Sequence, residues 1–252
     1  VDRKKHSCAE GHIERMVRPS ELRVEPMCEH FGLCGGCKWQ HLPYEYQLQC
    51  KQQQVVDAME RIAKVPIPAI NPILGSAQTT HYRNKLEYTF SNKCWLTREQ
   101  LESGEEFPDR NAAGFHIPGA FDKVLDIKRC WLQDDISNEM RLFIRGLCVE
   151  KGYSFYDIRG QQGFIRMTMT RTASTGEIME VIVFGEDNQA AIDDVMSAVR
   201  DRFPQITSLL YVVNLKVNDS LADQEFVTYS GRDYIEEEME GVRFRVGPKS
   251  FY

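Results

Sequence analysis

Three cysteines lie close together in the pattern Cys28-x5-Cys34-x2-Cys37. Three glycines interrupt this run, and glycine lets the backbone turn sharply and point its N–H groups at sulfur. Ordinary packing of a protein core gives no reason for so tight a triplet. The pattern therefore predicts that several thiolates are held on one inorganic centre.

The spacing of these cysteines favours an iron–sulfur cluster over zinc. A structural zinc site normally pairs two Cys-x2-Cys or Cys/His knuckles, and only Cys34 and Cys37 form one here. Iron–sulfur clusters tolerate uneven spacing and can take one ligand from far along the chain. The candidates for a fourth thiolate are Cys8, Cys50, Cys94, Cys130 and Cys148.

We expect Cys130 to be the fourth ligand, because it follows a strand-like segment and begins a helix, which makes it a fixed point in the core. Cys50 instead falls in a Gln- and Lys-rich stretch that is typical of a helix. Two alternatives stay open at this point. The thiols could be ordinary reduced cysteines, or they could form a Cys3His zinc site with His30 or His41.

Composition limits the class of protein. The chain is long and 42% hydrophobic, and it has neither a signal peptide nor an apolar run of about 20 residues, so a secreted disulfide scaffold and a membrane protein are not expected. We expect a reducing compartment, the cytoplasm. The net charge of −6 argues against coating nucleic acid by bulk charge, so any RNA binding must use a local basic surface.

The pattern along the chain predicts three parts. Residues 1–24 are interpreted as the tail of a small β-domain and a linker, residues 25–74 as the cysteine loop and a helix, and residues 75–252 as an α+β domain. The chain starts at Val1 and stops at Tyr252 without an element that would close a domain, so we expect a fragment of a longer protein.

Hydrophobic periodicity predicts the elements of these parts. The first helix, residues 45–63, carries one apolar stripe of Val55, Met59 and Ile62. The larger part is predicted to be an antiparallel sheet with two packed helices on one face, resembling a ferredoxin-like unit. Its strands are expected at 85–90, 113–117, 123–128, 165–171, 177–184, 208–216, 225–229 and 242–246, and its helices at 132–151 and 188–203. The acidic run 236–240 is interpreted as a solvated loop or strand edge.

The chemistry of a complete active site is missing from the sequence. A nucleotide- or methyl-donor site should show a Gly-rich turn between a strand and a helix, and the sequence has none. It does interleave basic and aromatic residues, a mixture that holds single-stranded RNA. The candidate RNA-binding residues are Tyr82, Arg83, Lys85 and Phe251.

Several of these motifs together resemble a known family. The run from Cys28 to Cys37, the segment 82–85, the segment Asp126-Ile127-Lys128-Arg129-Cys130 and the final Pro248-Lys249-Ser250-Phe251 occur in the order found in RumA-type 23S rRNA (uracil-5-)-methyltransferases of the TrmA superfamily. The resemblance extends over nearly the whole chain.

The resemblance implies an N-terminal TRAM domain, a central domain with a [4Fe–4S] cluster and a C-terminal Rossmann-like domain that binds S-adenosylmethionine. The chain looks like the end of the first, all of the second and none of the third. Cys28, Cys34, Cys37 and Cys130 correspond to the four cluster ligands, and Arg83 to a position of RNA contact. Phe251 matches the aromatic residue just before an active-site Gln and Asn. The tRNA-modifying relatives lack the cysteines, so the resemblance favours 23S rRNA as the partner of a monomeric enzyme.

In the reaction that the family implies, a cysteine thiolate adds to C6 of a flipped uridine, C5 takes the methyl group, and a carboxylate removes the C5 proton. Both catalytic residues lie beyond the matched part, so we nominate no catalytic residue and expect the fragment to be inactive. An anionic cluster needs nearby cations, for which Lys38, Lys128 and Arg129 are candidates.

Three other functions stay open from the sequence: a ferredoxin-like electron carrier, a zinc-containing RNA-binding module, and a tRNA uracil-C5 methyltransferase. The sequence alone leaves undecided which uridine is methylated, and whether the cluster is structural or redox-active.

Overall fold

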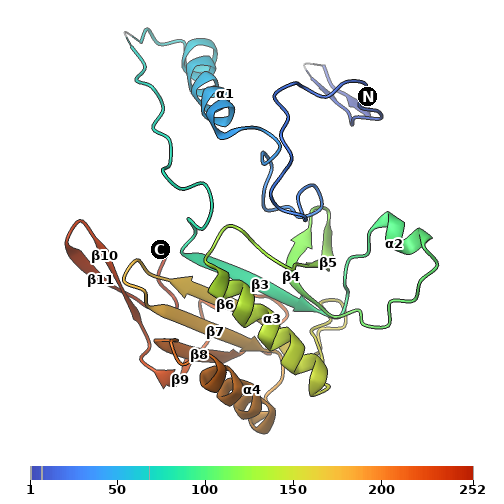
Figure 1. The fold of residues 1–252 in the computed structure, drawn as a ribbon, viewed down its shortest axis with the longest axis vertical. Coiled ribbons are helices and arrows are strands. Elements are labelled where there is room, and N and C mark those ends of the chain that lie inside the picture. Colours follow the sequence, from blue (N-terminus) through green and yellow to red (C-terminus); the bar gives the residue numbers. More distant parts are fainter. Residues whose placement is uncertain (1, 7, 68, 252) are drawn as a thin grey trace. The chain divides into compact units, whose positions relative to one another are not determined.

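The computed structural model describes residues 2–6, 8–67 and 69–251, and it divides into two compact units (Figure 1). Unit 1 contains residues 1–27 and 39–75, and unit 2 contains residues 28–38 and 76–252. The cysteine loop therefore belongs to the same unit as the large sheet. The domain boundaries expected from the sequence stay a prediction.

Unit 1 has little core of its own. Strands β1 (Arg3–Lys4) and β2 (Ala9–Glu10) pair antiparallel, and helix α1 (Tyr44–Asp57) continues as a π-helix, η1 (Ala58–Ala63). These two helical segments cover the range predicted for the first helix. No residue of α1 or η1 is buried, and Val55 and Ile62 of the apolar stripe are 51% and 81% exposed.

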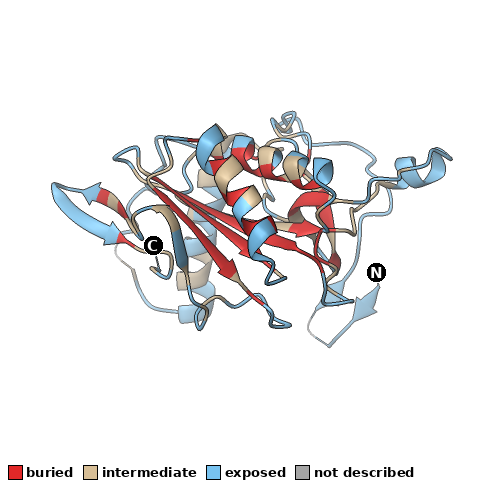
Figure 2. Cartoon of the chain, turned by 90° about the horizontal axis from the view of Figure 1, so that it is seen from below, coloured by how far each residue is buried: buried red, intermediate tan, exposed pale blue. Residues whose placement is uncertain are grey.

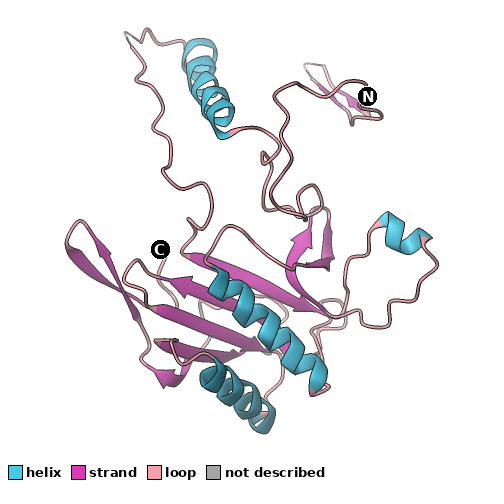
Figure 3. Ribbon diagram, in the orientation of Figure 1, coloured by secondary structure: helices cyan, strands magenta, loops and turns pink. Residues whose placement is uncertain are grey.

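Unit 2 is built on a seven-stranded sheet with the order β5-β4-β3-β6-β7-β8-β9 (Figure 3). The strands are β3 (Lys85–Ser91), β4 (Ala112–Ile117), β5 (Ala120–Asp126), β6 (Ile165–Thr172), β7 (Ile178–Phe184), β8 (Ser208–Val213) and β9 (Val227–Gly231). The prediction of an antiparallel sheet is wrong for one pair, because β7 and β8 are parallel. The helix between them carries the chain back to the end where β7 started, so β8 must run in the same direction.

Two helices pack on one face of this sheet, as predicted. Helices α3 (Asp135–Glu150) and α4 (Gln189–Arg202) contribute to one apolar cluster with the central strands. Met140, Ile144 and Cys148 lie four residues apart on α3 and are fully buried, which is the spacing of one helix face. The central strands are buried along their length, as the red ribbon in Figure 2 shows.

Two elements depart from the sequence expectation. The acidic run forms strand β10 (Ile235–Met239), which pairs with β11 (Val242–Val246) in a hairpin. Within it Glu237 is only 4% exposed, because its carboxylate accepts hydrogen bonds from the backbone and hydroxyl of Ser174. A short helix, α2 (Arg98–Glu102), begins with a capping box at Thr97, between the strands predicted at 85–90 and 113–117, where we predicted no helix. Across residues 2–6, 8–67 and 69–251, every helix is too short or too polar to span a bilayer.

Candidate functional site

The cysteine loop is held by its own backbone and by the turn between β4 and β5. The N–H groups of Leu33 and Cys34 donate to the carbonyl of His30, and the His30 ring Nε2 accepts from the N–H of Lys128 at 2.9 Å. A Cβ at Gly35 would come within 2.8 Å of the Pro118 ring, so only glycine fits there without displacing that ring. The loop is therefore docked onto residues that are about 100 positions away in the sequence.

Cys130 is fixed by a side chain of the following helix. Its N–H donates to Oδ1 of Asn138 at 2.7 Å, and Nδ2 of Asn138 donates back to the Cys130 carbonyl at 3.0 Å. The thiol residue is 8% exposed. This pair of bonds ties Cys130 to α3, although the helix begins only at Asp135 and not directly after Cys130 as the sequence suggested.

The structure brings the four predicted ligands into one region of unit 2. Burial raises the pKa of the Cys130 thiol, and Cys37, Cys34 and Cys28 raise it further by charge repulsion. Burial also raises the pKa of Cys28, with smaller contributions from Cys34 and Cys37. Cys34 packs against the apolar cluster that contains Cys130. The four thiols are therefore close enough to influence one another electrostatically.

A backbone N–H group and an ammonium group favour the ionised form of the Cys34 thiol. Burial raises the pKa of Cys34, but the N–H of Gly36, 3.4 Å from Sγ, and the ammonium of Lys38 both lower it. Among the residues that the structure describes, no group of three or more His, Cys, Asp or Glu side chains is arranged to hold a metal ion. The metal site itself therefore stays a prediction.

The histidines of the zinc alternative are placed differently. Nε2 of His30 is engaged by the N–H of Lys128, so that nitrogen is not free for a metal. His41 belongs to unit 1, whereas all four candidate thiols belong to unit 2. Of the other cysteines, Cys8 and Cys50 also belong to unit 1. Cys148 lies on the buried face of α3, where burial raises the pKa of its thiol to about 12.

The predicted RNA-binding segment lies directly beside Cys130. The N–H of His81 donates to the carbonyl of Trp131, and the N–H of Arg83 donates to that of Leu132, both at 2.8 Å. Between these bonds the Tyr82 side chain is 55% exposed, and Arg83 is exposed as well. Backbone pairing thus places two candidate RNA contacts next to a candidate cluster ligand.

The other two predicted RNA contacts lie apart from this segment or are engaged. Nζ of Lys85 is 3.5 Å from a carboxylate oxygen of Glu87 on the same strand. Phe251 is fully exposed near the end of the chain. Neither residue is positioned by a contact to the cysteine region.

Sequence reasoning missed an aromatic stack at this place. The guanidinium of Arg129 lies 3.8 Å from the centre of the Trp131 ring and pairs with both carboxylate oxygens of Asp135. The ring of His81 is parallel to that of Trp131 within 8°, with centroids 6.1 Å apart. The signal in the sequence was the Arg-Cys-Trp run itself, in which a cation and an aromatic residue flank Cys130.

Sequence reasoning also missed Arg141, a buried cation behind Cys130. Arg141 is 1% exposed, and its guanidinium donates to the carbonyls of Ala113 and Lys128 at 2.9 and 3.1 Å. A weaker bond of 3.4 Å reaches Oδ1 of Asn138, and the ring of Tyr88 lies 5.0 Å away. Burial lowers the pKa of Arg141. No sequence signal marks it, because all these partners come from other elements.

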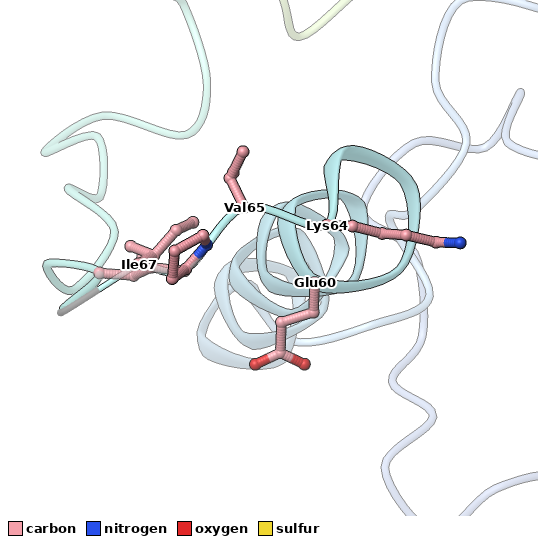
Figure 4. A pocket seen from close by; sticks show the side chains of 6 residues that line it. Glu60, Lys64, Val65 and Ile67 are labelled. Atoms are coloured by element: carbon pink, nitrogen blue, oxygen red, sulfur yellow. The ribbon is translucent and has the colours of Figure 1, made fainter.

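Cavities are also found away from the cysteine region. One of about 700 Å³ lies at the end of η1 in unit 1, where the labelled side chains of Glu60, Lys64 and Val65 diverge (Figure 4). Nothing converges there that could fix a ligand. A smaller cavity of about 230 Å³ in unit 2 is bordered by Thr89 and His116, whose side chains are hydrogen-bonded to each other at 3.3 Å.

Comparison with known proteins finds relatives that match the whole chain. It is 54% identical over 257 residues to an uncharacterized RNA methyltransferase of Porphyromonas gingivalis, and 49% identical over 255 residues to one of Bacteroides thetaiotaomicron. Each match covers 100% of this chain and 55% or 56% of the relative. No family model matches the chain. The chain thus spans about half the length of the curated relatives it matches.

The fold is also shared with a solved structure. The tRNA (uracil-54, C5)-methyltransferase of Pyrococcus abyssi, determined with S-adenosyl-L-homocysteine, superposes with a TM-score of 0.64 over 94% of this chain and 49% of that one, at 24% identity. The chain is thus similar over its full length to proteins named as RNA methyltransferases, which agrees with the resemblance drawn from the sequence, and it shares its fold with the solved structure.

Proposed function

We propose that the chain is the RNA-recognition and [4Fe–4S]-bearing part of an S-adenosylmethionine-dependent methyltransferase that modifies C5 of a uridine in 23S rRNA. The observation that supports this most directly is the backbone pairing of residues 81–83 with residues 131–132, beside the thiol of Cys130. Cations and aromatic rings in that segment suit unpaired RNA. The protein is proposed to act as a monomer in the cytoplasm.

The four thiols fit a cluster by their chemistry. Cys28, Cys34, Cys37 and Cys130 would hold it, and their mutual effects on pKa are those of sulfurs that share one region. Single-ion coordination, with Zn–S distances of about 2.3 Å, requires a tighter arrangement of sulfurs than a cubane of four irons. When bound, the cluster would tie residues 28–37 to residue 130 and so fix the surface on which RNA is laid.

The residues of this chain would bind and orient the substrate. Arg83 and Lys85 would contact phosphates, while the exposed rings of Tyr82 and Phe251 would stack on unpaired bases. The nucleophile, the base and the S-adenosylmethionine site are proposed to lie in a separate part of the intact protein. We therefore expect this chain alone to bind RNA without methylating it.

RNA binding is tested with Arg83→Ala and a matched control, Arg98→Ala. Arg98 is an exposed arginine of α2 that pairs only with Glu102 of the same helix turn. Loss of one phosphate contact should weaken binding of a uridine-containing 23S rRNA stem–loop several-fold, and should lower the salt dependence by about one unit of slope. Equal binding by the two variants would contradict the assignment of Arg83.

The second candidate is a tRNA uracil-C5 methyltransferase, which the solved relative from Pyrococcus abyssi favours. The two candidates are separated by competition between the 23S rRNA stem–loop and a tRNA stem–loop that contains the target uridine. We expect the ribosomal RNA to win. A preference for the tRNA stem–loop would replace the first candidate with the second.

A further inference from the structure

Arg141 carries a charge that no carboxylate pairs with directly. Its hydrogen-bond partners are the carbonyls of Ala113 and Lys128, the amide oxygen of Asn138 and the side chain of Tyr88, all of them uncharged. Among the residues that the structure describes, no carboxylate lies within ion-pair distance of it, and its buried Nε has no hydrogen-bond partner. The site is therefore a fully buried cation bound only to dipoles.

Such an arrangement is costly. A guanidinium does not lose its proton under any ordinary condition, so burial cannot be relieved by neutralisation as it can for lysine. Carbonyl oxygens and the face of Tyr88 solvate the charge in part. A charge kept in this position needs an anion nearby to make its burial favourable.

The carboxylate of Asp126, which attracts the Arg141 guanidinium, already has other hydrogen-bond partners. Asp126 interacts with Arg141 electrostatically, but its Oδ1 accepts bonds from Arg145 at 3.1 Å and from the N–H of Ala113 at 2.9 Å. Arg145, on the next turn of the same helix, takes most of that charge, since it also pairs with Asp109. Arg141 is left without a dedicated carboxylate.

Two side chains, those of Asn138 and Tyr88, link Arg141 to the cysteine region. Asn138 joins the two, because it bonds both backbone groups of Cys130 and also reaches the Arg141 guanidinium. Tyr88 contacts the guanidinium and packs in the same apolar cluster as Cys130. Two of the three cations expected from the sequence are engaged by carboxylates, Lys128 by Glu29 and Arg129 by Asp135, and the third, Lys38, acts on Cys34.

We propose that Arg141 is the buried counter-charge of the iron–sulfur cluster, held behind Cys130 to stabilise the anionic state of the metal centre. This inference rests on the proposed function, because it needs the cluster. A [4Fe–4S]2+ core with four thiolates carries a net charge of −2, and reduction by one electron makes it −3. A buried cation interacts with that charge across a poorly screening interior, whereas an exposed cation is screened by water.

Three consequences follow. Removing the charge should make the cluster harder to reduce, since the added electron loses a favourable interaction. It should also weaken retention of the cluster in its oxidised form. The metal-free chain should suffer least, because without the cluster the hydrogen bonds of Arg141 go only to uncharged groups.

The test compares Arg141→Met and Arg141→Lys with the control Lys128→Met, on anaerobically reconstituted chain. Lys128 is an exposed cation, 77% accessible at its side chain, two residues from Cys130. Iron and sulfide are counted, and the reduction potential is measured by titration with dithionite followed by electron paramagnetic resonance. Circular dichroism checks that each variant is folded.

We expect Arg141→Met to reduce the equilibrium constant for one-electron reduction at least tenfold, equivalent to a shift of about 59 mV to lower potential. Arg141→Lys should keep most of the wild-type potential, and Lys128→Met should shift it by less than a third as much. A potential unchanged in Arg141→Met, or an equal shift in Lys128→Met, would overturn the assignment. If Arg141→Met does not fold, a wild-type potential in Arg141→Lys supports the assignment, and a shift as large as tenfold in that variant overturns it.

Failure of the proposed function gives a different result. If the wild-type chain takes up no iron under these conditions, there is no cluster to tune, and both proposals fall together. If the wild-type chain loads iron and sulfide but the potential does not respond to Arg141, only the counter-charge assignment falls.

Discussion

The cysteine region and the centre of the sheet are stabilised in opposite ways. At the centre, β6, β7 and β8 bury Ile165, Ile182 and Leu209 against α3 and α4, and the apolar cluster is complete without a ligand. The cysteine loop is attached mainly by polar contacts, such as that from Lys128 to His30, and by the fit of Gly35 to Pro118. Apolar packing accounts for the first region, whereas the second has thiols and a buried cation that packing alone does not explain.

The two regions therefore need different physical explanations. Apolar burial accounts for the stability of the sheet but says nothing about function, because related folds serve many activities. Buried charge and clustered thiols contribute little to stability by themselves. They are retained where a ligand completes them, and they are therefore the places to look for a site.

The largest effect expected is the loss of the metal in Cys130→Ser. A serine oxygen is a poor ligand for iron, so anaerobically reconstituted protein should lose most of its iron and sulfide. Cys94→Ser is the matched control, since Cys94 is a half-buried thiol outside the proposed ligand set. Equal iron in the two variants would place the fourth ligand elsewhere.

A substitution at the sheet centre should have the opposite signature. Ile182→Ala removes fully buried methyl groups and should lower the free energy of unfolding by about 2–5 kcal/mol. Iron content per folded chain should not change. The matched control is Ile62→Ala on η1, where the side chain is 81% exposed and the expected cost is under about 0.5 kcal/mol. Comparable costs at the two positions would contradict the difference in packing between the units.

A smaller effect is expected where the loop meets the sheet. His30→Ala leaves the N–H of Lys128 without its acceptor, which should cost roughly 1–3 kcal/mol. Hydrogen exchange at that amide should become faster, and iron should be retained less firmly. The exposed His12, which contacts only Asp2, provides the control substitution. Unchanged exchange at Lys128 would mean that the His30 contact does not hold the loop.

A dependence on pH is expected at the sheet centre. Glu180 on β7 is fully buried, and burial raises its pKa from 4.5 to about 8 in the folded chain. The folded state therefore holds more protons than the unfolded state between these two values, so stability falls as pH rises through that window, by up to about 1.4 kcal/mol per pH unit.

Glu180→Gln should remove that slope, because a neutral amide does not titrate. The variant should be more stable than the wild type at pH 8 and similar to it near pH 4.5, as measured by denaturant unfolding across the range. Glu139→Gln, on the exposed face of α3, serves as the control. A wild-type slope in Glu180→Gln would show that another group is responsible.

The sequence predicted those features that depend on neighbours in the chain. The hairpin of β6 and β7 and the two helices of unit 2 were predicted because apolar periodicity and short turns are local signals. Strand β10 was read as a solvated loop or edge, because the burial of Glu237 depends on Ser174, which lies 63 residues away. The parallel pairing of β7 with β8 follows from the path of α4, which no local pattern records.

The candidate site was predicted only in part, because some of its contacts join residues that are far apart in the sequence. The cysteine pattern marked Cys28, Cys34 and Cys37, since spacing carries the signal of a shared ligand, whereas Cys130 was chosen from five candidates by its place after a predicted strand, and the ligand set stays a prediction. Arg141 carried no such signal, because its carbonyl partners at Ala113 and Lys128 come from outside its helix. Trp131 follows Cys130 in the sequence, but only its contact with Arg129 in the structure shows that the ring is part of an ordered stack.

Metal analysis of the anaerobically purified chain tests the central claim most directly. The account predicts about four irons and a matching amount of sulfide per chain, as expected for a single [4Fe–4S] cluster. One zinc per chain, or no metal after reconstitution with iron and sulfide, would contradict it.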